Sequence, residues 1–440
     1  MVASMSNSYA SEDRLQEFNV NESNVRYYCR RMPCVFTTAR NSIMWDEDGG
    51  EYIDFLSACG SLNYGHNHPR LKAPVLDYLL NDGIVNSLDL HTSAKQEFIR
   101  KFRKVVLEPR DLEYRLQFTG PTGTNAVEAA LKLARKATGR RMIAAFTNGF
   151  HGMTLGALAV SGSSSARQSV GGLLDGVVRL PFEGYRGAGI AELDRFQAMA
   201  LDPSSGVEPP AAFIVETVQG EGGLNVASEK WLRRLSALAH ALGSLLIVDD
   251  IQAGCGRTGK FFSFEGAGIE PDIVCLAKSL SGIGLPMAVV LLKPDCDVWS
   301  PGEHSGTFRG NNLAFVSAAA ALELWTEPAF TGSLSALTTI IHETIRQIVE
   351  DSAPVPLRMK GLGMMSGIEF PSGALAARVA DVAFKRGVLI ETAGPNDEVL
   401  KIMPPLTIEA NLLGEGLRRL REAVRTVLYS VEPDISARAA

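Results

Sequence analysis

A chain of 440 residues leaves room for two or three domains, or for one large domain with a smaller one attached. Its hydrophobic content of 46% and charged content of 21% are typical of a globular enzyme and exclude a disordered protein. The net charge of -6 argues against a nucleic-acid partner. No apolar run reaches the ~20 residues that span a bilayer, so no membrane contact is expected.

The N-terminal residues have neither a basic start nor an apolar core, so we expect no secretory signal and a cytoplasmic location. Residues 1–24 are predicted to form a polar arm. Residues 41–56 predict a β-hairpin, because two strand-like runs flank the turn at Asp48-Gly49-Gly50.

From residue 93 onwards, amphipathic helices alternate with short apolar strands. Helices are predicted at 94–106 and 125–138, and strands at 115–119, 142–146, 212–216, 245–250, 273–277 and 287–292. This alternation predicts an α/β fold with a large, doubly wound, mostly parallel sheet. The last strand follows its predecessor so closely that we expect the two to pair antiparallel.

Two more helices are predicted at 311–327 and 334–348. After the break at Pro354–Pro356 the sequence predicts a smaller α+β unit, with strands at 363–370, 388–391 and 398–402 and helices at 373–386 and 414–429. We therefore divide the chain into the arm 1–24, a first part of a small domain at 25–90, a large domain at 91–325, and a second part of the small domain at 326–440. The small domain is thus built from both ends of the chain.

Six cysteines are spread along the chain: Cys29, Cys34, Cys59, Cys255, Cys275 and Cys296. Their spacing contains no C-x-x-C pair, so reduced core thiols of a cytoplasmic protein are expected. His66 and His68 lack further ligand residues nearby, and no metal site is expected.

Polar residues follow two of the predicted strands at the point where each strand ends. Asp249 and Asp250 follow the first strand, with Gln252 close behind, and Lys278 follows the second. Burying a lysine is costly unless the ammonium is paired or chemically used. Pyridoxal phosphate enzymes need such a pair, a lysine for the Schiff base and a carboxylate that keeps the pyridine nitrogen protonated. Ordinary loop acids, a helix cap or a metal pair are the alternatives for the two aspartates.

The segment GCGRTG between these strands, residues 254–259, formally matches the G-x-G-x-x-G dinucleotide fingerprint. The fingerprint should follow a strand directly and open a helix, whereas residues 260–272 are too rich in Gly and Pro, and too aperiodic, to be that helix. A nucleotide-dependent oxidoreductase is therefore the alternative from another class.

A glycine-rich turn directly precedes the predicted helix 125–138. Backbone N–H groups of Gly123, Thr124 and Asn125 would point at an anion, and the helix dipole favours a phosphate there. The alternative is that Thr122 or Thr124 merely caps the helix. Phe150, in a Phe-His-Gly sequence after a strand, could stack on a flat cofactor. Residues 304–312 suit anion contact or form a plain loop.

Together these segments resemble the class III pyridoxal-phosphate aminotransferases, of fold type I, from about residue 35 to residue 427. The matching motifs, in chain order, are DGGEYIDFLSACGSLNYGHNHP at 48–69, TGTNAVEAALKLAR at 122–135, FHG at 150–152, ETVQGEGG at 216–223, DDIQAGCGRTG at 249–259, LAKSLSG at 276–282 and HSGTFRGNN at 304–312. The resemblance implies pyridoxal 5'-phosphate as the cofactor, held in domain 91–325.

The resemblance also implies a role for each cofactor-binding residue. Lys278 would form the Schiff base and move the proton, and Asp249 would form a salt bridge with the pyridine nitrogen. Gln252 would lie near the ring 3-hydroxyl, and Gly123 and Thr124 would hold the phosphate. We expect the desolvated strand end and the nearby cationic ring to lower the pKa of Lys278.

Further roles concern the ring, the substrates and the assembly. Phe150 would stack on the ring, and Thr307 would reach the phosphate from the partner subunit, which implies a homodimer or an assembly of dimers. Glu221 would be the gate-type glutamate near the substrate carboxylate. Lys401 stands where many relatives have a carboxylate-binding arginine, and lysine lacks arginine's planar bidentate fork. Asp250 stands at a position where many class III aminotransferases have a glutamate.

Within the family, the chain resembles the branch of diaminobutyrate–2-oxoglutarate aminotransferases of ectoine or siderophore biosynthesis. This branch implies transfer of the terminal (4-) amino group between L-2,4-diaminobutyrate and 2-oxoglutarate, with aspartate 4-semialdehyde and glutamate as the products. The implied partners are thus small molecules, an amino donor and a 2-oxo acid. The alternative within the family is another ω-amino donor, ornithine or 4-aminobutyrate.

Overall fold

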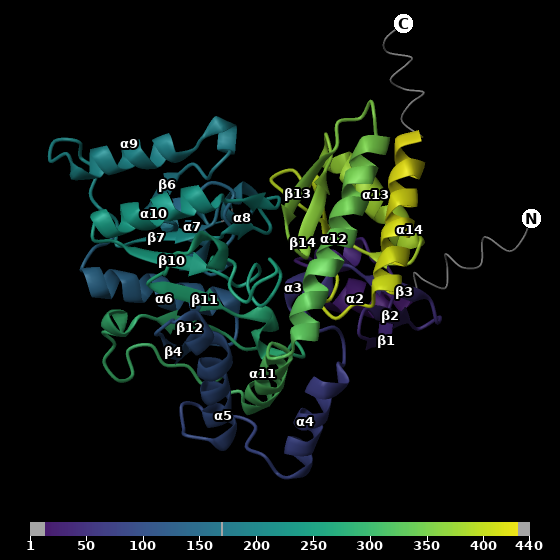
Figure 1. The fold of residues 1–440 in the computed structure, drawn as a ribbon, viewed down its shortest axis with the longest axis horizontal. Helices are drawn as coiled ribbons and strands as arrows, with labels where there is room; N and C mark the ends of the chain where they lie inside the picture. The colour runs from purple at the N-terminus through teal and green to yellow at the C-terminus, as the bar shows by residue number, and fades with distance from the viewer. Residues whose placement is uncertain (1–13, 169, 430–440) are drawn as a thin grey trace, which may run out of the picture.

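The computed structural model describes residues 14–168 and 170–429. It contains a large body built around a seven-stranded sheet and a smaller body that carries the C-terminal helices (Figure 1). The predicted arm lies partly outside the described residues, and within its described part Gln16–Asn21 forms the short helix α2.

The large sheet has the strand order β4-β12-β11-β10-β7-β5-β6. These strands are Arg115–Phe118, Val289–Leu292, Ile273–Leu276, Leu245–Asp249, Ala212–Val215, Ile143–Phe146 and Val177–Leu180, in that order. Only β12 runs antiparallel within this sheet, since it opposes both β11 and β4 while the other recorded pairs are parallel. The predicted doubly wound sheet and its antiparallel last strand are confirmed. The edge strand β6 was not predicted from the sequence.

Helices cover both faces of this sheet, as the alternation of side chains along its strands requires. On β10, Leu246 and Val248 pack into the core that contains Trp231 of α10 (Glu229–Ala241). Ile247 between them points to the opposite core, which is formed with α6 (Gly123–Thr138). Further helices around the sheet are α5 (Ser93–Phe102), α7 (Leu155–Val160), α9 (Ile190–Leu201) and α11 (Asn312–Leu324).

The smaller body joins segments from both ends of the chain, in agreement with the layout expected from the sequence. Strands β1 (Phe36–Arg40), β2 (Ile43–Asp46) and β3 (Glu51–Asp54) form a sheet with β15 (Val388–Leu389), which pairs parallel to β3. A second sheet has the order β13 (Arg358–Leu362), β14 (Met365–Glu369), β17 (Val399–Ile402) and β16 (Glu391–Ala393). The domain boundaries given above stay predictions.

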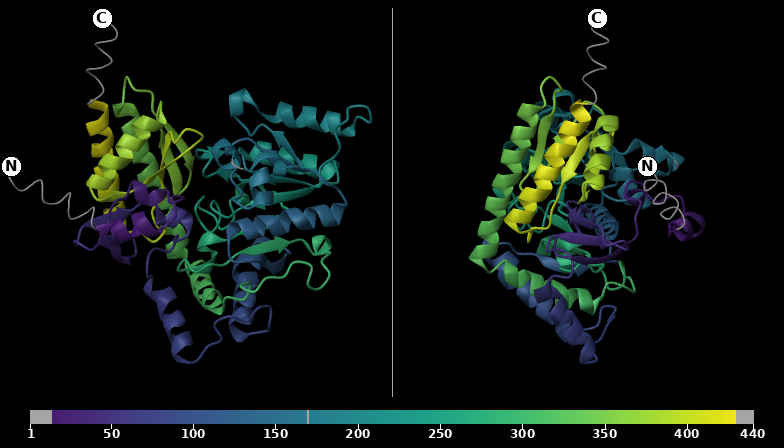
Figure 2. Two further views of the ribbon diagram at one scale, coloured as in Figure 1. Left: turned by 180° about the vertical axis from the view of Figure 1, so that it is seen from behind. Right: turned by 90° about the vertical axis from the view of Figure 1, so that its right-hand side faces the viewer.

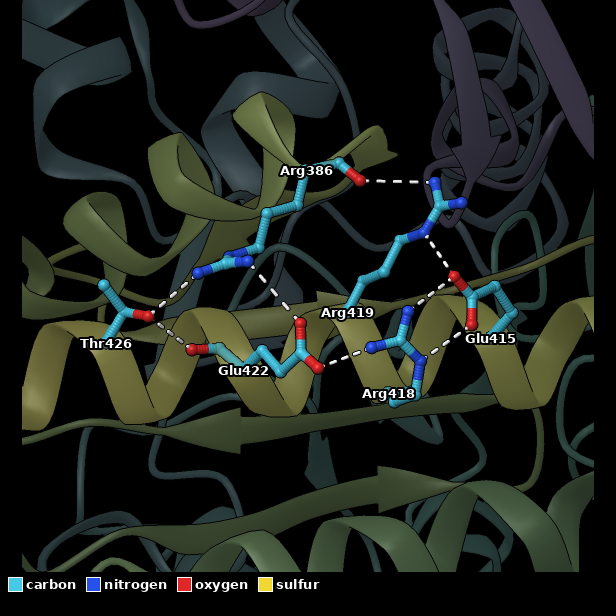
Figure 3. A network of polar contacts seen from close by, with 6 residues as sticks. All are labelled: Arg386, Glu415, Arg418, Arg419, Glu422 and Thr426. Atoms are coloured by element: carbon cyan, nitrogen blue, oxygen red, sulfur yellow. Dashed lines mark hydrogen bonds and ion pairs between the residues drawn. The ribbon is translucent and has the colours of Figure 1, made fainter.

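Three helices lie side by side in the smaller body: α12 (Pro328–Asp351), α14 (Ala410–Tyr429) and α13 (Gly373–Lys385) (Figure 2). On the exposed side of α14, Arg418 pairs with Glu415 and Glu422, and Arg419 reaches the carbonyl of Arg386 at the end of α13 (Figure 3). Such exposed pairs add little to stability because water screens them, so the buried apolar cluster beneath them holds the helices together.

The expectation that the cysteines are core thiols is wrong for part of the set. All six are free thiols, but Cys29 is exposed, and Cys34 and Cys59 are only half-buried. The N-terminal segment that carries Cys29 packs on the surface, which its sequence pattern did not reveal. Within residues 14–168 and 170–429, no group of three potential metal ligands is found, and no helix is long and apolar enough to cross a membrane.

Candidate active site

Asp249 and Lys278 meet at the carboxyl ends of the neighbouring parallel strands β10 and β11. Asp249 is the last residue of β10 and lies opposite Cys275 of β11. Lys278 follows β11 with a φ of 51°, a left-handed conformation that is uncommon outside glycine. Burial lowers the pKa of Lys278, as expected from the sequence, while the carboxylate of Glu221 opposes that change. The structure thus brings the predicted acid and amine to one sheet edge.

His151 holds the Asp249 carboxylate from the side of β5. Nδ1 of His151 lies 2.7 Å from Oδ2 of Asp249, and both side chains are buried. A carboxylate can only accept, so the imidazole donates this hydrogen bond. The backbone N–H of Ile251 donates to the other oxygen at 3.2 Å. The sequence prediction missed this role, although His151 directly follows Phe150.

Glu216 anchors the loop that carries Phe150. The backbone N–H of Phe150 donates to Glu216 Oε2 at 2.8 Å, and that of Gly220 donates to Oε1 at 3.2 Å. Burial raises the pKa of Glu216 to about 7. This carboxyl group therefore links the loop predicted to stack on the cofactor with the loop that precedes Glu221, a role that sequence analysis did not foresee.

The start of α6 lies beside the end of β10, as a phosphate site requires. A Cβ added to Gly123 would lie 3.1 Å from side-chain atoms of Ile251, so glycine allows the close approach. Oγ1 of Thr124 lies 2.6 Å from Oγ1 of Thr154. Thr122 occupies the N-cap position, but its hydroxyl donates to Asn125 Oδ1 and makes no cap hydrogen bond. Thr122 therefore does not fill the alternative capping role. The N–H of Asn125, which was expected to point at the anion, donates instead to the carbonyl of Thr122 at 3.0 Å, which leaves Gly123 and Thr124 as the predicted phosphate donors.

Glu221 and Lys401, the two predicted substrate-binding residues, form an ion pair. Glu221 lies in the turn between the short strands β8 (Val218–Gln219) and β9 (Asn225–Val226). Nζ of the fully buried Lys401 donates to Glu221 Oε1 at 2.8 Å and lies 2.8 Å from Oε1 of Glu391. Burial alone would raise the pKa of Glu221. The ammonium groups of Lys401 and Lys278 nevertheless lower this pKa to about 2. Glu391 was not predicted, because its position opposite Lys401 depends on the register of β16 and β17.

Within the described part of the chain, Thr307 makes no hydrogen bond or ion pair with the site residues above. It lies exposed in the loop between β12 and α11. The segment GCGRTG forms a turn-rich loop that opens no helix, which counts against the dinucleotide alternative. Arg257 of this loop is fully buried and donates to Asn63 Oδ1 at 2.6 Å.

The residues present fit pyridoxal phosphate. Nε2 of Gln252 donates to the Cys59 carbonyl at 3.0 Å and to Glu221 at 3.2 Å. Oε1 of Gln252 is buried and has no hydrogen-bond partner in the described part of the chain. A ring hydroxyl at that position would supply the missing donor. A lysine and a buried carboxylate follow or end the neighbouring strands β11 and β10, and the glycine-rich helix start lies against Ile251 just after β10.

Comparison with known proteins agrees with this geometry. Residues 26–424 match the model of the aminotransferase class-III family. The chain is 49% identical to a diaminobutyrate–2-oxoglutarate transaminase of Halalkalibacterium halodurans, over 96% of this chain and 99% of that protein. It is 54% identical to one of Vibrio parahaemolyticus, over 93% of this chain and 97% of that protein.

Among solved structures, the ornithine aminotransferase of Toxoplasma gondii superimposes with a TM-score of 0.81 at 26% identity, over 96% of both chains. A second structure of that enzyme, with PLP at partial occupancy in its active site, gives a TM-score of 0.82 at 26% identity, over 97% of this chain and 99% of that one. The fold and the site therefore define an aminotransferase of fold type I that uses pyridoxal 5'-phosphate. The chain belongs to the aminotransferase class-III family, which confirms the predicted family, fold and cofactor.

Proposed function

We propose that this enzyme moves the terminal (4-) amino group between L-2,4-diaminobutyrate and 2-oxoglutarate, with aspartate 4-semialdehyde and glutamate on the other side of the equilibrium. The observation that carries the proposal is the similarity to transaminases of that name along almost the whole chain. The ion pair of Glu221 and Lys401 beside Lys278 supports it, since one site must accept two different substrates.

When bound, pyridoxal phosphate supplies an electron sink for the negative charge that develops when the reacting carbon loses a proton. Asp249, oriented by His151, keeps the ring nitrogen protonated. Lys278 removes this proton and returns it, which its lowered pKa favours because the amine must be neutral to act as a base. Gly123 and Thr124 hold the phosphate with N–H and hydroxyl donors, Phe150 stacks on the ring, and Gln252 contacts the ring hydroxyl.

Glu221 would regulate access to Lys401. While the donor is bound, Glu221 keeps the ammonium of Lys401 neutralised. When 2-oxoglutarate binds, Glu221 swings away and Lys401 binds a substrate carboxylate. Glu221 is suited to such movement because it lies in a turn and is half-buried, whereas Lys401 is held within β17.

We further propose a homodimer in which Thr307 completes the partner's phosphate site. The apolar side chains of Leu76, Leu79, Leu80, Ile84, Val85, Leu88 and Leu90 are all exposed along residues 76–90, in and after helix α4 (Pro69–Leu80). This segment is tied to the Thr307 loop, because the N–H of Ser87 donates to the carbonyl of Gly310 at 3.0 Å. Such a patch is larger than isolated surface hydrophobics, and a second copy would cover it together with Phe308.

A cytoplasmic location and a place in ectoine or siderophore biosynthesis belong to the same proposal. Both rest on the resemblance to the diaminobutyrate branch. The substrates of that branch are small polar molecules.

The proposed donor is tested by following the visible absorbance of the bound cofactor. Mixing the purified enzyme with L-2,4-diaminobutyrate should bleach the band of the lysine-bound cofactor, and 2-oxoglutarate should restore it. Ornithine and 4-aminobutyrate are the matched comparisons. A faster reaction with either of them would overturn the assignment of the donor while leaving the aminotransferase class intact.

A further inference from the structure

Lys401 lies between two carboxylates, although one would neutralise it. Its Nζ is 2.8 Å from an oxygen of Glu221 and 2.8 Å from an oxygen of Glu391. Lys401 is fully buried and Glu391 is 4% exposed. With both carboxylates ionised and the amine of Lys278 neutral, these side chains carry one negative charge in excess. Burial accordingly raises the pKa of Glu391. A buried excess charge is costly, so the cluster favours a cation beside it.

Glu391 also has an unfilled hydrogen-bonding position. Lys401 donates a hydrogen bond to Glu221 and lies 2.8 Å from Oε1 of Glu391, which has no other donor within residues 14–168 and 170–429. The other oxygen, Oε2, accepts from the weak S–H donor of Cys59 at 3.5 Å. A carboxylate oxygen can accept two hydrogen bonds, so an ammonium group of the substrate would supply the second donor.

This cluster faces the reacting end of the site. The charges of Glu221, Glu391 and Lys401 all act on the pKa of Lys278, which burial lowers. Glu391 and Lys401 are direct cross-strand neighbours in the antiparallel pair β16–β17, so both are fixed by the sheet. Gln252 connects the backbone of Cys59 with Glu221 and thereby joins the cluster to the cofactor-binding loop.

We propose that Glu391 binds the α-ammonium of the amino donor and thereby selects donors that carry a second ammonium group. This inference rests on the proposed function, since it requires a diamino acid whose terminal amine reacts near Lys278. The α-ammonium has three N–H donors, of which one fills Glu391 Oε1 and balances the excess charge. 4-Aminobutyrate lacks this ammonium, so its carboxylate, which both donors carry, meets the negative cluster without a compensating positive charge.

Glu391 has the opposite effect on the acceptor. 2-Oxoglutarate brings two carboxylates and no ammonium, and Glu391 still neutralises part of the charge that Lys401 offers. Removing the Glu391 charge should therefore weaken the reaction of the diamino donor and strengthen the binding of the acceptor. A general structural defect would impair both half-reactions.

The test compares wild-type and Glu391→Gln holoenzyme with L-2,4-diaminobutyrate and 4-aminobutyrate, which differ only in the α-ammonium. We expect kcat/KM for diaminobutyrate to fall by about 10- to 100-fold, the effect of losing one charge-assisted hydrogen bond. The value for 4-aminobutyrate should change by less than about 3-fold, and KM for 2-oxoglutarate should fall. If kcat/KM fell equally for both donors, so that the ratio of the two values stayed unchanged, the role of Glu391 would be overturned.

Two further variants keep the test decisive. Glu391→Asp keeps the negative charge on a shorter side chain. Its activity with diaminobutyrate should fall selectively, but less than in Glu391→Gln. This variant replaces Glu391→Gln in the test if the latter does not fold. Glu369→Gln on β14, whose carboxylate faces Arg358 at 3.8 Å, is the matched control and should alter neither donor ratio nor acceptor KM. A wild type inert towards diaminobutyrate but active with another donor would instead overturn the proposed function.

Discussion

The imidazole of His151 and the carboxylate of Asp249 form a buried hydrogen bond of 2.7 Å between the ends of strands β5 and β10. The bond fixes the rotamer of Asp249 and leaves its Oδ1 with a weaker donor, the N–H of Ile251 at 3.2 Å. A carboxylate oriented in this way can pair with a cationic ring nitrogen without first reorganising. His151 therefore acts on the cofactor through Asp249.

Replacing His151 should weaken cofactor binding. In His151→Asn, the shorter side chain no longer reaches Asp249, and we expect the affinity for pyridoxal phosphate to fall by about 10-fold, the effect of one lost charge-assisted hydrogen bond. Absorbance titration of cofactor into the cofactor-free enzyme measures this change. His342→Asn is the matched control, because His342 is half-buried in the smaller body and contacts Ser366 at 2.9 Å. Equal losses in both variants would contradict the role of His151.

Lys278 should be indispensable for both colour and turnover. Lys278→Ala removes the amine that bonds to the cofactor and moves the proton, so we expect transaminase activity to fall by about 10⁴-fold or more. The visible absorbance of the lysine-bound cofactor should disappear as well. Lys260→Ala, at an exposed lysine of the preceding loop, should keep both properties. A Lys278→Ala enzyme with normal turnover would disprove the assignment.

The residues that were predicted and those that were missed differ in a physical way. Asp249 and Lys278 stand next to apolar strands, and the sheet architecture alone puts the ends of such strands together. His151 and Glu391 act through partners 98 and 10 residues away. Their contacts depend on strand order and register, which local sequence patterns do not specify. For the same reason the paired Glu221 and Lys401 were recognisable only through their resemblance to the family.

Asp250 should make the stability of the enzyme depend on pH. Burial raises its pKa from 3.8 to about 7, against the hydrogen bonds from Ser263. The folded state thus holds a proton that the unfolded chain has released, and this contribution to stability, complete below about pH 4, is lost as the pH rises through about 7. Asp250→Asn cannot ionise, so its Tm should decline less than that of the wild type between about pH 5 and about pH 8.

Thermal unfolding of both holoenzymes across this pH range measures the difference. Asp82→Asn, at an exposed aspartate, provides the control and should follow the wild type. Parallel declines of Tm in Asp250→Asn and wild type would show that Asp250 does not hold the proton.

Lys401 should matter most in the half-reaction with 2-oxoglutarate. Lys401→Met removes the buried ammonium and leaves Glu221 and Glu391 facing each other without a cation. We expect kcat/KM for 2-oxoglutarate to fall by about 100-fold and Tm to fall as well, since buried carboxylates without a partner are destabilising. Lys360→Met on β13, where the ammonium binds Asn225 at 2.7 Å, is the control for loss of a half-buried lysine. A normal KM for 2-oxoglutarate in Lys401→Met would exclude Lys401 as the carboxylate-binding group.

The proposed contribution of Thr307 to the neighbouring site predicts complementation between inactive subunits. Thr307→Glu should repel the phosphate, and Lys278→Ala removes the amine, so each homodimer should be nearly inactive. If Thr307 serves the partner, a mixed dimer has one site with Lys278 and an intact Thr307, and mixing the two variants should restore activity. Wild type mixed with the double variant is the control, since no site in that mixed dimer would then be complete. In the control, activity should fall below that of the wild-type subunits present. Restored activity in the first mixture together with this fall would support the dimer and an interface that includes the exposed Thr307 loop and the segment 76–90, and no restoration would contradict the role of Thr307.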